Sequence, residues 1–166
     1  MKALRIVRSV VPMFAIAFAL PICATLALER AGSSGAAGKI PRFHDAKAQT
    51  AEFVGYSSSI RLTAEQKQMR DRALGAMPAP CCKKFSMATC CCSCNLAKSV
   101  WGLSNSLIVR GADAGTVQTA VSKWLAFSNP GGFSGDACDV PAGCQRAIDT
   151  NGCGGMSETN IVASKN

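Results

Sequence analysis

The sequence predicts an all-α fold, a small three-helix bundle with a Cys-rich loop and an irregular, cysteine-containing C-terminal tail. Three observations lead to this prediction. Apolar residues recur with a helical period in three segments after residue 60. Six of the ten cysteines lie within Met77–Cys94, and the residues from Phe133 onward are rich in Gly and Pro without apolar periodicity. A length of 166 residues favours one domain, preceded by a signal peptide or membrane anchor.

The N-terminal segment has the layout of a secretory signal peptide. Lys2, Arg5 and Arg8 precede an uncharged apolar run over residues 9–28, which Glu29 ends. The run is also long enough to cross a membrane, which takes ~20 residues, so cleaved peptide and uncleaved anchor both remain open. We therefore expect residues 1–30 to direct export, to a periplasmic or membrane-anchored location facing outside the cytoplasm.

Residues 31–59 are rich in Gly, Ser and Ala and lack a sustained period, which predicts a flexible linker. The Cys-rich helical domain then covers residues 60–166. His44, the only histidine, lies in the expected linker and is interpreted as a solvated side chain. A single histidine excludes zinc sites that need two or three, and it leaves Ser-His-Asp and Cys-His catalysis without a base. We assign no catalytic residue on this basis and do not favour an enzyme.

The first predicted helix begins at a capping box, in which Thr63 is followed three residues later by Gln66. Pro78 ends this helix. Its apolar stripe includes Met69 and Met77, which we interpret as core residues rather than copper ligands.

The second helix is expected to begin near Cys90–Ser93 and to run to Arg110, with Gly111 as the left-handed residue beyond it. Asp113 then caps a third helix that ends at Asn129. The short connection makes the two helices antiparallel neighbours. Two tryptophans are expected to anchor the core between them: Trp101 and Trp124.

The charge pattern argues against a nucleic-acid partner. The net charge is +8, but the basic residues form no run and few aromatic residues lie near them.

Cysteine density carries the functional prediction, because crowded thiols oxidise, bind metal or exchange disulfides. Metal binding is favoured, with a soft ion such as copper or zinc ahead of an iron–sulfur cluster. The predicted ligands are Cys81, Cys82, Cys90, Cys91, Cys92 and Cys94. Three cysteines of the tail are additional ligands or disulfide partners: Cys138, Cys144 and Cys153. Cys23 lies in the N-terminal segment, which leaves an odd number for pairing.

Two alternatives remain open. In the first, Cys91 and Cys94 form the C-x-x-C of a thiol–disulfide oxidoreductase, with Cys91 attacking and Cys94 resolving. A helix that starts near them lowers both thiol pKa values, which suits a reductase and a metal site equally. The adjacent Cys90 and Cys92 favour metal, since a reductase needs only two cysteines. The second alternative is a disulfide-stapled structural domain without a catalytic site. The expected partners are a metal ion and an exported redox protein or metalloprotein.

The order of these features resembles the exported PCYCGC-motif proteins: Met77-Pro78, clustered cysteines, then a C-x-x-C that opens an amphipathic helix. Residues 91–127 are also similar to the thiol-reductase domain of cytochrome c maturation. That domain is a small three-helix bundle whose C-x-x-C precedes a polar amide, as Asn95 follows Cys94 here. Both resemblances imply an exported helical domain, and the second implies redox-active cysteines.

Overall fold

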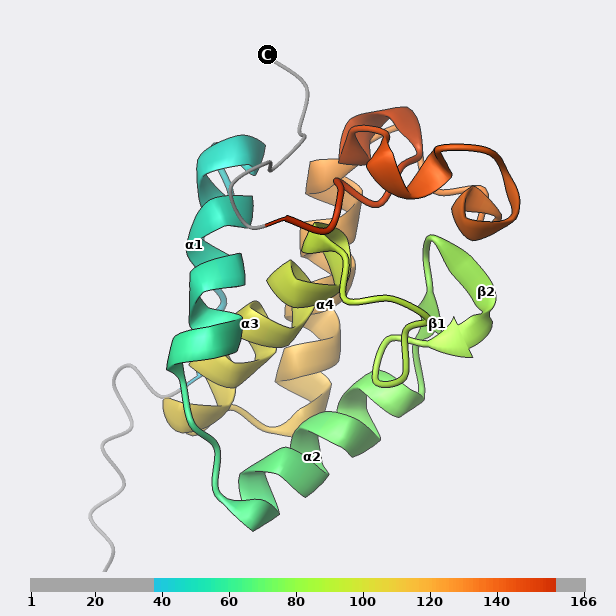
Figure 1. The fold of residues 1–166 in the computed structure, drawn as a ribbon. Helices are drawn as coiled ribbons and strands as arrows, with labels where there is room; N and C mark the ends of the chain where they lie inside the picture. Colours follow the sequence, from blue (N-terminus) through green and yellow to red (C-terminus); the bar gives the residue numbers. More distant parts are fainter. Residues whose placement is uncertain (1–37, 158–166) are drawn as a thin grey trace, which may run out of the picture. The chain divides into compact units, whose positions relative to one another are not determined.

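The computed structural model describes residues 38–157, and within them the chain is mostly helical with a Cys-rich C-terminal segment, as expected. This range forms four α-helices, a two-stranded sheet and three short 3-10 helices, whose arrangement in space Figure 1 shows. Their bounds are α1 (Ala46–Ser59), α2 (Ala64–Gly75), β1 (Pro78–Ala79), β2 (Cys82–Ser86), α3 (Asn95–Val109), α4 (Ala114–Ser128), η1 (Ala137–Asp139), η2 (Gly143–Gln145) and η3 (Ile148–Thr150). The bundle in the described residues therefore has one helix more than the three predicted.

The additional helix, α1, occupies the second half of the predicted flexible linker, so that prediction is wrong there. Asp45 caps α1 by accepting a hydrogen bond from the backbone N–H of Ala48 at 2.9 Å. Its buried residues include the polar Gln49 and Thr50, whose side chains donate to backbone carbonyls. A buried face that mixes the polar Gln49 and Thr50 with the apolar Phe53 and Val54 gives no sustained apolar period, which explains why the sequence pattern misses this helix.

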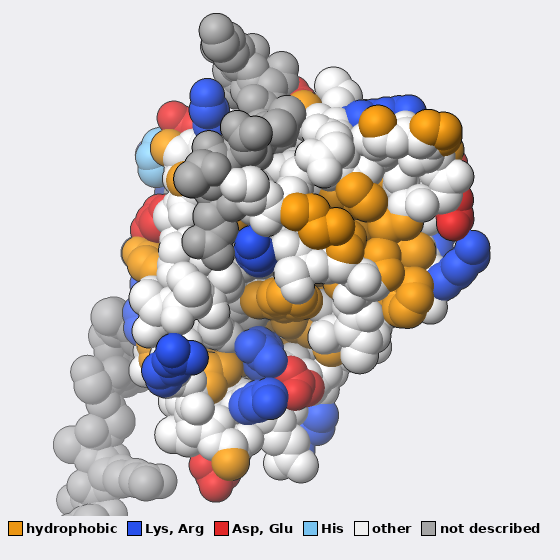
Figure 2. All heavy atoms as spheres, viewed as in Figure 1, with side chains coloured by type: hydrophobic (Ala, Val, Ile, Leu, Met, Phe, Trp, Pro, Cys, Tyr) orange, Lys and Arg blue, Asp and Glu red, His pale blue; other side chains and the backbone are white. Residues whose placement is uncertain are grey.

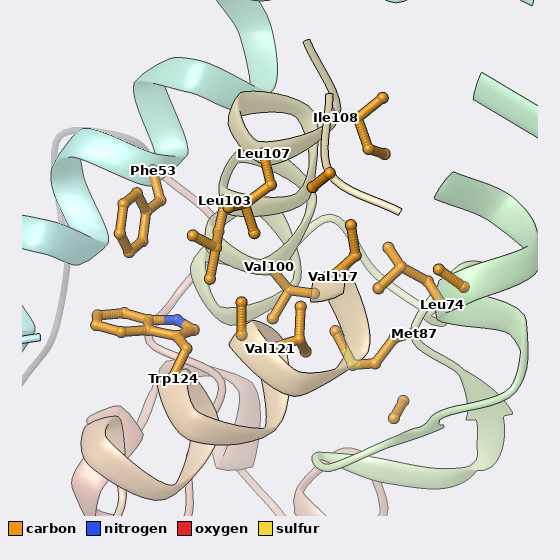
Figure 3. Packing of buried hydrophobic residues seen from close by; sticks show 14 residues of the cluster. Phe53, Leu74, Met87, Val100, Leu103, Leu107, Ile108, Val117, Val121 and Trp124 are labelled. Carbon is orange, nitrogen blue, oxygen red and sulfur yellow. The ribbon is translucent and has the colours of Figure 1, made fainter. Parts of the chain in front are cut away.

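The most extensive helix pairing joins α1 to α3, and it depends on Gly102. A Cβ atom on Gly102 would lie 1.7 Å from the carbonyl oxygen of Phe53, so the backbones meet at a distance that only glycine permits. Phe53 then packs edge-on against Trp124, with ring centroids 5.0 Å apart. The two aromatic rings lie between α1 and α4 (Figure 3).

The capping signals of the other helices are confirmed. Both hydrogen bonds of the Thr63–Gln66 capping box are present at the start of α2. Gly111 has φ +86° beyond α3, and Asp113 accepts from the N–H of Thr116 at 2.7 Å at the start of α4. The start of α3 differs from the prediction, because Cys94 is the N-cap and residues 90–93 precede the helix.

The main hydrophobic cluster fills the space between the four helices (Figure 3). Trp124 is fully buried in it and donates to Ser99 Oγ at 3.1 Å. Trp101 is half-buried and donates to the carbonyl of Met87 at 2.8 Å. Met69 and Met77 pack against this cluster, as their interpretation as core residues requires.

The predicted Cys-rich loop contains a small antiparallel hairpin, β1–β2. Cys81 lies between the two strands, and Cys82 begins β2. The N–H of Lys83 donates to the carbonyl of Gly135 at 3.0 Å, which ties the hairpin to the C-terminal segment. The fold is therefore not purely α-helical.

None of the helices within residues 38–157 is both long enough and apolar enough to cross a membrane. The signal peptide or anchor predicted over residues 1–30 lies outside the described residues.

Replacing Gly102 by Ala should destabilise the reduced protein by about 1–3 kcal/mol or more, because a backbone carbonyl must move to admit the methyl group. Chemical denaturation measures this change. Gly55→Ala on the facing helix α1 is the matched control, since its Cβ meets nothing within 4 Å. The control should stabilise the fold by about 0.5–1 kcal/mol. Equal effects of the two substitutions would contradict the close approach at Gly102.

Candidate metal centre

The C-terminal segment returns to the first turn of α3, where it binds the backbone. The N–H of Asn95 donates to the carbonyl of Gly155 at 2.8 Å, and the N–H of Leu96 donates to that of Cys153 at 3.1 Å. These are N–H groups that a helix cannot satisfy internally. The buried Asn95 side chain also donates, to Gly154 at 2.7 Å and to Ser157 at 3.0 Å. The segment, red in Figure 1, therefore lies beside the start of α3.

Two glycines make this return path possible without a large apolar core. A Cβ atom on Gly143 would lie 1.9 Å from the carbonyl oxygen of Ala137, and one on Gly152 would lie 2.2 Å from that of Arg146. Both residues are buried where successive turns stack backbone on backbone. The glycine-rich composition that predicted an irregular tail thus permits a tightly packed one.

Four cysteines surround the start of α3, and we call them the inner group: Cys81, Cys90, Cys94 and Cys153. Cys94 is the N-cap, and its Sγ accepts from the N–H of Ala97 at 3.5 Å. The Sγ atoms of Cys81 and Cys90 are 3.8 Å apart, and both lie within 4.8 Å of Cys94 Sγ. Cys153 joins this group through Cys81, because their Sγ atoms lie within 4.8 Å of each other. Cys81, Cys94 and Cys153 are buried, and Cys90 is half-buried.

The other five described cysteines form what we call the outer group: Cys82, Cys91, Cys92, Cys138 and Cys144. Cys138 on η1 is its centre. Its Sγ lies 3.1 Å from Cys91 Sγ and 3.9 Å from Cys144 Sγ. Cys91 and Cys92 Sγ atoms are 3.9 Å apart. Cys91 is the exposed cysteine among the nine that the structure describes.

The two groups are continuous. Five sets of three thiols have all their Sγ atoms within 4.8 Å of one another. The sets are Cys81–Cys90–Cys94, Cys81–Cys138–Cys153, Cys82–Cys91–Cys138, Cys90–Cys91–Cys92 and Cys92–Cys138–Cys144. Two of these sets contain cysteines of both groups. Several sets of thiols are therefore close enough to hold a metal ion.

Hydrogen bonding makes Cys94 the most acidic thiol of the inner group. Its pKa is held below the usual range, first by the neighbouring thiol of Cys153 and then by those of Cys81 and Cys90. The N–H of Ala97 adds to this effect. The pKa of Cys81 is raised, first by the neighbouring thiol of Cys153. The hydrogen bond with Cys81 lowers the pKa of Cys90, but donation to Cys94 and burial outweigh it and raise that pKa to about 11.

In the outer group, burial is the first cause that raises the pKa values of Cys92 and Cys138. The hydrogen bond with Cys91 raises the Cys138 value further. In the metal-free site the thiolate form is thus favoured at Cys94 and disfavoured at Cys81, Cys90, Cys92 and Cys138. That arrangement supplies a first ligand for a cation, and further ligands form as thiols lose their protons.

All nine cysteines singled out in the sequence lie in these sets, so the structure brings the tail cysteines to the central ones. The described cysteines are free thiols. Cys91 and Cys94, the predicted C-x-x-C pair, belong to different groups, and Cys91 precedes α3 rather than capping it. His44 is exposed and lies in none of the sets. The sequence analysis did not assign Asn95 a role in binding the tail. The one signal for that role in the sequence is the position of Asn95 directly after the C-x-x-C.

Comparisons with protein-family models, curated proteins and solved structures found no match for this chain. The resemblances to the PCYCGC-motif proteins and to the cytochrome c maturation domain therefore stay predictions.

Replacing Asn95 by Ala removes two hydrogen bonds that hold the tail, at a cost of about 1–3 kcal/mol. We expect the segment around Cys153 to open more often, so that alkylation of Cys153 in the reduced, metal-free protein becomes about tenfold faster or more. Timed alkylation with peptide mapping measures this rate.

Asn105→Ala is the control for this experiment. Asn105 is also a buried asparagine of α3, but its side chain accepts a hydrogen bond from Arg70 of α2 rather than bonding to the tail. Its substitution should leave the Cys153 rate near that of the unaltered protein. Equal acceleration by both substitutions would show that Asn95 does not act through the tail.

Proposed function

We propose that this protein binds a soft metal ion, copper or zinc, through cysteine thiolates. The observation that carries the proposal is the spacing of the sulfur atoms. A tetrahedral site with Zn–S bonds of about 2.3 Å places its thiolates about 3.8 Å apart. The Sγ distances of 3.8 Å for Cys81–Cys90 and 3.9 Å for Cys138–Cys144 match this separation.

The donor set supports an ion that prefers sulfur. The sets of close ligand atoms in the described residues contain cysteine alone, without histidine, aspartate or glutamate. Thiolates select copper(I) and zinc over harder cations such as magnesium or calcium. The thiolate form of Cys94, which its N–H donor at the start of α3 favours, supports its assignment as a ligand of the bound cation.

Thiol–disulfide exchange receives less support from the same geometry. An exchanging thiolate must be accessible, and the resolving cysteine must reach the attacking one. Cys94 is fully buried, and the close partners of Cys91 are Cys92 and Cys138. The thiols also gather in overlapping sets of three, whereas a disulfide framework needs separate pairs.

The place of action is part of the proposal. The basic and apolar N-terminal pattern of residues 1–30 supports export, and an exported metal-binding domain would act in the periplasm or at the outer face of a membrane.

Metal uptake by a variant with Cys81→Ser and Cys94→Ser tests the proposal, since both residues are buried in the inner group. Reduced full-length protein is loaded with copper(I) or zinc, desalted and measured by elemental analysis. The unaltered protein should retain metal and gain about 4 kcal/mol of stability at a free metal concentration one thousand times Kd. The double variant should retain less metal and lose most of that gain.

His44→Ala is the matched control, because it removes the other side chain best suited to soft metals without touching a thiol. It should bind as much metal as the unaltered protein. Unchanged metal content in the double variant, or loss of metal in the His44 variant, would contradict the thiolate assignment.

A further inference from the structure

We infer that the nine described thiols hold several copper(I) ions in one cluster with bridging thiolates, rather than a single ion. This inference rests on the proposed function and specifies how the thiols share the metal. It follows from the way in which the sets of three overlap.

The overlap is extensive. Cys138 belongs to three of the five sets, and four other cysteines belong to two each: Cys81, Cys90, Cys91 and Cys92. Ions in separate mononuclear sites would need separate ligands, and no more than two of the five sets are free of shared cysteines, as Cys81–Cys90–Cys94 and Cys92–Cys138–Cys144 are. A third ion would therefore have to share thiols with the first two. A thiolate sulfur has enough lone pairs to bind two ions at once. A cysteine that belongs to two sets is therefore placed to bridge two ions in a cluster. Cys138, which belongs to the most sets, would be the ligand with the most bridges.

Copper(I) fits these sets better than zinc does. Zinc in structural sites takes four ligands in a tetrahedron. Each of the five sets in the described residues offers three thiols and not four. Copper(I) is a soft ion that thiolates select, and it accepts three-coordinate sites. With bonds of about 2.3 Å, a trigonal site would place its thiolates about 4.0 Å apart, so the 3.9 Å of Cys138–Cys144 is compatible with either geometry and the number of ligands decides between the ions.

Burial of the ligands also favours more than one cation. Cys81, Cys82, Cys94 and Cys153 are all buried, and a buried thiolate is costly unless a positive charge lies beside it. Several monovalent ions spread through the cluster would place a charge next to each of these sulfurs. One ion would reach at most the thiols of a single set.

Entry to the cluster is at Cys91. It is the exposed cysteine among the nine, and it belongs to two sets, one of which includes Cys90 of the inner group. Hydrophobic side chains, a class in which Figure 2 includes cysteine, gather on the face formed by the hairpin and the C-terminal segment (orange in Figure 2). A copper(I) ion bound first at Cys91 can therefore pass to deeper thiols without leaving sulfur ligands.

The chemistry of loading is simple. Each thiol that becomes a ligand exchanges its S–H bond for an S–Cu bond and releases the proton to solvent. Copper enters and stays as copper(I), so neither the metal nor the sulfur changes oxidation state.

The experiment is an anaerobic titration of the reduced full-length protein with copper(I), supplied as its acetonitrile complex in the presence of a chromophoric copper(I) chelator. We expect tight binding of more than one copper per chain, and a copper–copper scattering shell in X-ray absorption of the loaded protein. Cys138→Ser should lose more than one equivalent of copper. Cys144→Ser, a half-buried thiol of the same segment that belongs to one set, should lose at most one.

Saturation at one copper without a copper–copper shell would overturn the cluster and leave the proposed function standing. Equal losses in the two variants would overturn the bridging role of Cys138. No tight copper binding would overturn this inference, and the proposed function would then depend on zinc uptake in the experiment above. Circular dichroism checks that both variants fold. If a variant does not fold, X-ray absorption of the unaltered, copper-loaded protein still decides whether a copper cluster forms.

Discussion

The arrangement of the sulfur atoms depends on how the first turn of α3 is completed. A helix leaves its first N–H groups without internal partners, and here the Cys94 sulfur and the carbonyls of Cys153 and Gly155 accept from them. One backbone requirement thus brings the C-terminal segment to the central cysteines. Asn95 strengthens the junction with two further hydrogen bonds. The tail has little apolar surface of its own, so this junction, rather than burial alone, sets where its cysteines lie.

The apolar interior is divided in a way that matches this arrangement. The main cluster lies between the four helices and consists mostly of aliphatic and aromatic residues. A second cluster contains Cys81, Cys94 and Cys153 with Leu96 and Ile148. Trp101 and Leu125 contact both clusters. The helices can therefore pack without metal, whereas the second cluster uses cysteine as its core residue, and its packing is the part of the fold that ligation would change.

Local signals in the sequence explain what could be predicted. The Thr63–Gln66 box, Gly111 and Asp113 fixed three helix boundaries because each acts on its own neighbours. The start of α3 was placed too early because its N-cap is Cys94, a residue type outside the usual capping set. Helix α1 was missed because Gln49 and Thr50 are buried.

The site was predictable in composition but not in geometry. The density of cysteines in the sequence pointed to all nine thiols as site residues, because the packing of a core does not require so many cysteines. Their division into an inner and an outer group depends on contacts between residues far apart in the chain, such as Cys91 with Cys138. It also depends on close backbone contacts at Gly143 and Gly152. Such tertiary contacts leave no periodic signal, so the sequence alone could not separate a metal site from a disulfide framework.

The most direct test of the account is elemental analysis combined with a count of free thiols, on protein purified from its natural source without chelator or reductant. The account predicts copper or zinc in stoichiometric amount or above. It also predicts that most of the nine thiols are protected from alkylation but become reactive once the metal is removed by a chelator. Protein without metal, whose cysteines react only after a reductant is added, would show a disulfide framework and contradict the thiolate centre.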